Sequence, residues 1–123
     1  MNLHDVIERF TLVSGMTGSE VSRVLPLIVD CKEYFDEQIG DDLTASQQKR
    51  AAHACAVYAY YRVCLMLRDG GTESFKAGDV QINSSKLSER CEAARRMWDE
   101  ERGVVGDIGD FGGEGFAFRS VCV

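Results

Sequence analysis

The sequence has little of what membrane and secreted proteins require. Its most apolar stretch, 51–67, contains His53, Arg62 and three tyrosines, and much of its apolar content is alanine. A spanning helix needs about 20 predominantly apolar residues, so this stretch does not predict a membrane span. The first ten residues, MNLHDVIERF, carry acidic residues early and no apolar run, unlike a signal peptide. We therefore expect a soluble protein with no membrane partner.

Residues suited to catalysis or metal binding are also scarce. The two histidines, His4 and His53, lie in no ligand pattern such as HExxH. The sequence has no GxSxG motif, and the glycines of 109–115 lack the preceding strand and following helix that a phosphate-binding loop needs. We therefore predict that the protein is not an enzyme, that it binds no metal and that it uses no cofactor.

The five cysteines do not form a CxxC pair, and their number is odd. A disulfide framework or a zinc site would need tighter clustering. Four of them, Cys31, Cys55, Cys64 and Cys91, fall in apolar helical stretches. We interpret these four as small buried hydrophobic side chains of a protein in a reducing compartment.

The formal net charge is −6, with 20 acidic and 14 basic residues. Dedicated nucleic-acid binders usually carry a basic patch, and proteins that dock on anionic membranes carry clustered lysines and arginines. The acidic balance argues against both classes.

Apolar spacing and end signals predict four helices in one all-α bundle. The first covers 3–14 and ends at Gly15. The second begins at the Thr17–Glu20 capping box and reaches about Ile39, with a kink or short break expected near Leu25 because Pro26 follows.

The third helix follows a second capping box at 44–47 and ends before Asp69-Gly70-Gly71. Its apolar residues cover nearly its whole circumference, which hints that a second copy helps to bury it. The fourth helix spans about 85–102, with a buried stripe at Leu87, Cys91, Ala94 and Trp98.

Two segments do not fit the helical pattern. Residues 72–83 alternate apolar and polar side chains around a Gly-Asp turn, which predicts an extended loop or a small hairpin before the last helix. From Gly103 the chain holds six of the twelve glycines in 21 residues, together with three phenylalanines. We predict a helical bundle domain at 1–103 and a glycine-rich, extended C-terminal tail at 104–123, which either orders on a partner or a neighbouring subunit or is a flexible terminus.

The order of these features resembles the small head–tail connector (head-completion or adaptor) proteins of tailed bacteriophages and prophages. Four segments carry the likeness over nearly the whole chain: DVIERFTLVSGMTGSEVSRVLPLIVDCKEYFDEQI, AAHACAVYAYYRVCLM, SFKAGDVQINSS leading into the last charged helix, and the glycine-rich end with FAF. Each motif alone is weak, and their order is the informative part.

The resemblance implies a helical bundle that docks as a ring beneath the portal protein and extends the DNA exit channel. Its implied partners are the portal, a tail-side connector and neighbouring copies of itself, and DNA passes through the channel without specific binding. The protein would be made in the host cytoplasm and reside at the head–tail interface of the virion. By analogy, the subunit or portal contacts are Phe75, Lys76, Gly78, Asp79, Val80, Phe111, Phe116 and Phe118.

A second hypothesis remains open on the same residues. A helical interaction or regulatory module from a host or prophage, binding a protein partner as a small oligomer, would show the same composition and the same lack of catalytic motifs. Symmetry separates the two hypotheses, since a connector forms a closed ring and a regulatory module typically forms an isologous dimer.

Overall fold

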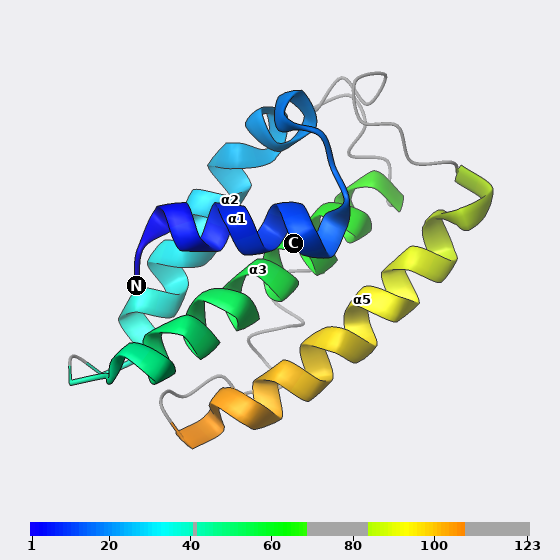
Figure 1. Cartoon of the computed structure of the whole chain (residues 1–123). Coiled ribbons are helices and arrows are strands. Elements are labelled where there is room, and N and C mark those ends of the chain that lie inside the picture. Colours follow the sequence, from blue (N-terminus) through cyan, green and yellow to red (C-terminus); the bar gives the residue numbers. More distant parts are fainter. Residues whose placement is uncertain (41, 69–83, 108–123) are drawn as a thin grey trace.

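The computed structural model describes residues 1–40, 42–68 and 84–107, and this part of the chain is all-helical (Figure 1). Within these ranges four α-helices follow one another: α1 (Leu3–Ser14), α2 (Gly18–Gln38), α3 (Ala45–Arg68) and α5 (Ser84–Val104). A short 3-10 helix, η2 (Val105–Asp107), continues α5. The predicted all-α class with about four helices is confirmed. The loop or hairpin expected at 72–83 and the tail from residue 108 lie outside the described residues.

Side-chain caps define where α2 and α3 begin. Thr17 Oγ1 accepts a hydrogen bond from the Glu20 amide at 3.3 Å, and the Glu20 carboxylate accepts one from the Thr17 amide at 2.9 Å. Thr44 and Gln47 form the same reciprocal pair, at 3.1 and 2.9 Å. These bonds satisfy amides that have no partner inside the helix, so both predicted capping boxes are confirmed.

Glycine ends α1, and proline leaves α2 unbroken. Gly15 adopts a φ of 71°, the left-handed conformation in which glycine has no Cβ penalty. α2 runs without a break through Pro26, so a break near Leu25 does not occur. Pro26 lacks the amide hydrogen that would bond the Ser22 carbonyl. Both residues are exposed, which allows water to solvate that carbonyl.

The four helices alternate in direction along the bundle (Figure 1). The ring centroids of Tyr58 in α3 and Trp98 in α5 lie 4.8 Å apart. Tyr60 comes later in α3, yet its hydroxyl accepts a hydrogen bond at 3.5 Å from Arg90, which comes earlier in α5. α3 and α5 are therefore antiparallel neighbours. At one end of the bundle, which we call the Met1 end, α1 and α3 begin and α2 and α5 finish. We call the opposite end the Arg68 end.

The core is built around α3, which packs against α1, α2 and α5. Phe35, Tyr58 and Trp98 bring three helices together, with ring centroids 4.8 to 6.1 Å apart. Phe10 of α1 meets Tyr60 edge-on at 6.4 Å. Thirteen of the 24 residues of α3 are buried. One chain thus covers the apolar circumference of α3, and this helix gives no reason to require a second copy.

One face of α5 faces the core and the other faces solvent. Cys91, Ala94 and Trp98 are buried, as the predicted stripe requires, while Glu92 and Arg96 pair at 3.8 Å on the exposed face. The helical conformation continues to 107, four residues past the boundary expected from composition. Val105 is fully buried in this extension, so its packing overrides the low helix propensity of the neighbouring glycines.

Candidate functional site

The contact residues inferred from the resemblance lie outside the described part of the chain. Phe75, Lys76, Gly78, Asp79 and Val80 belong to the segment 69–83, which joins α3 to α5. Phe111, Phe116 and Phe118 belong to the segment 108–123, which follows η2. Their assignment as contacts stays a prediction.

The described helices nevertheless define where these two segments are attached. The segment 69–83 connects Arg68 to Ser84, which both lie at the Arg68 end (Figure 1). The segment 108–123 continues from Asp107, after the end of α5, at the Met1 end. α5 has 21 residues and so separates the two attachment points by roughly 30 Å at 1.5 Å per residue.

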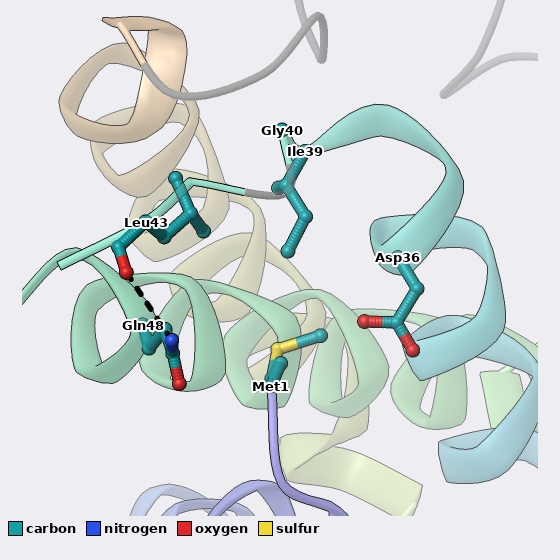
Figure 2. Close-up of a pocket in the computed structure, with 6 residues that line it drawn as sticks. All are labelled: Met1, Asp36, Ile39, Gly40, Leu43 and Gln48. Atoms are coloured by element: carbon teal, nitrogen blue, oxygen red, sulfur yellow. Dashed lines mark hydrogen bonds between the residues drawn. The ribbon is translucent and has the colours of Figure 1, made fainter. Parts of the chain in front are cut away.

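A pocket of about 230 Å³ opens at the Met1 end, where α2 connects to α3 (Figure 2). Its lining combines three apolar side chains with an acid, an amide and a glycine: Met1, Ile39, Leu43, Asp36, Gln48 and Gly40. Figure 2 shows Met1 reaching from the N-terminal segment toward Ile39, with Asp36 on one side and Leu43 and Gln48 on the other. The Gln48 amide nitrogen donates to the Leu43 carbonyl at 3.3 Å, which ties the connection to α3.

No pattern in the sequence pointed to this pocket. Its lining comes from the N-terminal segment, from the end of α2, from the connection and from α3, and no spacing rule links these four places. The sequence offered one weak signal of a pocket here, the two apolar residues Ile39 and Leu43 close to a helix connection.

Acidic side chains gather beside the pocket. Asp36 accepts a hydrogen bond from Lys32 Nζ at 2.6 Å and keeps a side-chain exposure of 38%. Glu33, Glu37 and Asp42 are exposed on the same end of α2 and on the connection. The last turn of α2 has no basic residue to complement the partial negative charge of the helix C-terminus. Lys32 already supplies a cationic partner to Asp36, the one acid among the described residues that line the pocket.

His53 joins α3 to α5 at the same end of the bundle. Its Nε2 lies 4.0 Å from a Glu101 carboxylate oxygen, a distance suited to an ion pair when the imidazole is protonated. The His53 Nδ1 and the Trp98 Nε1 are buried without a hydrogen-bond partner. Unsatisfied buried groups of this kind each cost about 1–3 kcal/mol. Trp98 is 1% exposed and belongs to the core, whereas the His53 side chain keeps 37% of its surface exposed at the edge of the bundle.

The four predicted buried cysteines are confirmed as buried free thiols. Burial raises the pKa of Cys31 from 9.0 to about 12, although the nearby Arg62 guanidinium partly opposes the shift. Burial and the neighbouring Cys91 raise the pKa of Cys64 to about 12, and burial beside Cys31 raises the pKa of Cys55. Thiols held in the protonated form are poor nucleophiles and poor metal ligands.

Neither a metal cluster nor a membrane-spanning helix is present in the described ranges. Among residues 1–40, 42–68 and 84–107, no three side chains of histidine, cysteine, aspartate or glutamate lie close enough together to hold a metal ion. Over the same ranges, every helix is too short or too polar to cross a lipid bilayer.

Comparison with known proteins gives no further assignment. No family model matches the chain, and neither the curated proteins nor the solved structures contain a significant match.

Proposed function

We propose that the protein is a structural component of a bacteriophage or prophage virion, a head–tail connector that docks as a ring beneath the portal and extends the DNA exit channel. The observation that carries the proposal is the attachment of the segments 69–83 and 108–123 at opposite ends of the bundle. A connector joins a partner above it to a partner below it, so it needs contact regions at both ends of its subunit.

The packing of the bundle supports this assignment. The aromatic residues of the described helices are largely used inside the chain: Phe10, Phe35, Tyr58 and Trp98 are at most 1% exposed. Two large apolar side chains of the described part are exposed, Leu12 and Val104, and they lie on different helices. Large apolar patches usually mark the docking face of a protein, and these isolated side chains do not form one. Contacts with partners then fall to the two attached segments and to the bundle ends.

Charge is compatible with a channel through which DNA passes. Proteins that hold DNA neutralise its phosphates with lysine and arginine, and each such contact adds affinity. This chain has a net charge of −6, with 20 acidic and 14 basic residues. Surfaces of this sign repel the phosphate backbone and therefore suit DNA that must slide.

Co-sedimentation with portal rings tests the proposal. The purified protein is mixed with the portal ring encoded by the same phage or prophage, and the pelleted fraction is compared for the full chain and for a variant lacking 111–123. We expect the full chain to pellet with the portal and the truncated variant to pellet less, because the tail supplies part of the contact.

Circular dichroism provides the control for that variant. The deletion starts after the last described residue of η2, so the helical signal and the melting temperature should be unchanged. A full chain that is folded but does not bind intact portals contradicts the proposal and favours the regulatory module, which a small dimer in analytical ultracentrifugation would then support.

A further inference from the structure

We infer that Cys64 of α3 and Cys91 of α5 form an oxidation site, at which a low-molecular-weight disulfide such as oxidised glutathione joins the two thiols into one cross-link. The cross-link fixes α5 to α3 within a single chain and needs neither a portal nor a second copy. Along the chain, α5 lies between the segments 69–83 and 108–123, so the link would hold the helix from which both segments extend.

The antiparallel register of α3 and α5 brings these two cysteines to the same level of the bundle. The rings of Tyr58 and Trp98 mark one level, since their centroids lie 4.8 Å apart. Cys64 follows Tyr58 by six residues, and Cys91 precedes Trp98 by seven residues. Because the helices run in opposite directions, both steps lead toward the Arg68 end, by about 9 and about 10.5 Å at 1.5 Å per residue.

Burial and hydrogen bonding indicate that the two sulfurs meet between the helices. Cys64 is fully buried and Cys91 is 2% exposed. Burial raises the pKa of Cys64 to about 12, and the charge of Cys91 and a hydrogen bond between the two side chains add to that shift. Two thiols that share a hydrogen bond have the proximity that a disulfide requires.

The other two buried cysteines provide a contrast within the same core. The rings of Phe35 in α2 and Tyr58 in α3 mark a common level, with centroids 6.1 Å apart. Cys31 precedes Phe35 by four residues, toward the Arg68 end, whereas Cys55 precedes Tyr58 by three residues, toward the Met1 end. These steps in opposite directions offset Cys31 from Cys55 by about 10 Å along the bundle. The fold therefore selects one pair among the four buried thiols.

The oxidation balances as two thiol–disulfide exchanges. The thiolate of one cysteine attacks a sulfur of oxidised glutathione, which forms a mixed disulfide and releases one glutathione thiolate. The thiolate of the second cysteine then attacks the protein sulfur of the mixed disulfide, forms the cross-link and releases the second glutathione thiolate. The two cysteine protons pass to the released glutathione thiolates, so the protein loses two electrons and the oxidant gains them.

Burial decides when the exchange takes place. A thiol must be ionised and accessible to attack a disulfide, and packing of the core prevents both conditions. The exchange therefore proceeds while the chain folds, or while α5 is detached from α3 by local unfolding. Packing of α5 on α3 then favours the opposed pair, and the closed loop between residues 64 and 91 stabilises the fold by constraining the unfolded chain.

Oxidative refolding of a Cys122→Ser variant tests the inference, because this variant keeps only the four buried thiols. The protein is unfolded in urea, diluted into a mixture of reduced and oxidised glutathione, and quenched with acid. The remaining thiols are alkylated after denaturation, and peptide mass spectrometry identifies the disulfide. We expect one disulfide, between Cys64 and Cys91, with Cys31 and Cys55 alkylated.

Two comparisons connect the disulfide to the fold. Adding Cys64→Ala should abolish the disulfide, whereas adding Cys31→Ala, the matched control at another fully buried thiol, should leave it in place. The oxidised protein should lose its helical circular dichroism signal at a higher urea concentration than the same sample treated with dithiothreitol.

Three results would overturn the inference. They are a refolded helical protein without a disulfide at every glutathione ratio, a mixture of pairings or a link between Cys31 and Cys55, and a Cys64–Cys91 link that lowers the urea midpoint. Portal binding enters none of these measurements, so each of the three results would leave the connector function standing.

Discussion

The four cysteines of the described helices should react with an alkylating reagent only when the protein unfolds. Cys31, Cys55 and Cys64 have no exposed surface, and Cys91 is 2% exposed. Cys122 lies in the tail, so a Cys122→Ser variant restricts the reaction to these four thiols. Iodoacetamide at pH 8 attacks the thiolate form, whose population depends on the pKa of each group.

The size of the effect follows from the pKa values. A thiol with a pKa of 9.0 is about one-tenth thiolate at pH 8, whereas a thiol at about 12 is thiolate in about one molecule in ten thousand. The pKa difference alone therefore lowers the thiolate fraction of Cys31 and Cys64 about a thousandfold in the folded protein. Steric burial adds to this protection.

Mass spectrometry after timed labelling measures the protection directly. We expect the unmodified mass to persist in buffer and four alkyl groups to be added across the same urea range in which the helical circular dichroism signal is lost. Rapid modification of even one thiol in buffer, with the helical signal intact, would refute the packing of that cysteine.

Two further predictions concern stability. Trp98→Ala should lower the free energy of unfolding by about 3–5 kcal/mol in urea titrations, because Trp98 packs on Tyr58 and is 1% exposed. Arg96→Ala, on the exposed face of the same helix, should change the free energy of unfolding by about 0.5 kcal/mol or less. Equal losses of unfolding free energy in the two variants would contradict the packing of Trp98 in the core. Because the unfolded Cys31 thiol ionises near 9.0 and the folded one near 12, stability should fall as pH rises from 9 to 12. This thiol should lower the free energy of unfolding by up to about 1.4 kcal/mol per pH unit in that range. The same pH dependence of stability in Cys31→Ala would argue against the raised pKa of Cys31.

Local signals in the sequence predicted the helices well. Hydrogen bonds between residues three apart start α2 and α3, and a single left-handed glycine ends α1, so each boundary depends on a few adjacent residues. The buried stripe of α5 also follows from spacing along one helix. Such features require no knowledge of tertiary packing.

Features that depend on several elements were not predictable in the same way. The coverage of α3 by three helices of one chain is decided by tertiary packing, and the sequence alone suggested a second copy. Val105 extends the helical conformation beyond Gly103 because its side chain is buried. The pocket depends on Met1, Asp36 and Gln48, which the fold brings together from distant positions.

Electron microscopy of the protein mixed with intact portal rings tests the central claim most directly. The connector account predicts an additional layer on the portal with cyclic symmetry, in which the Met1 end and the Arg68 end of each bundle face different neighbours along the channel axis. Portal rings that show no added density, in the presence of excess folded full-length protein, would contradict it.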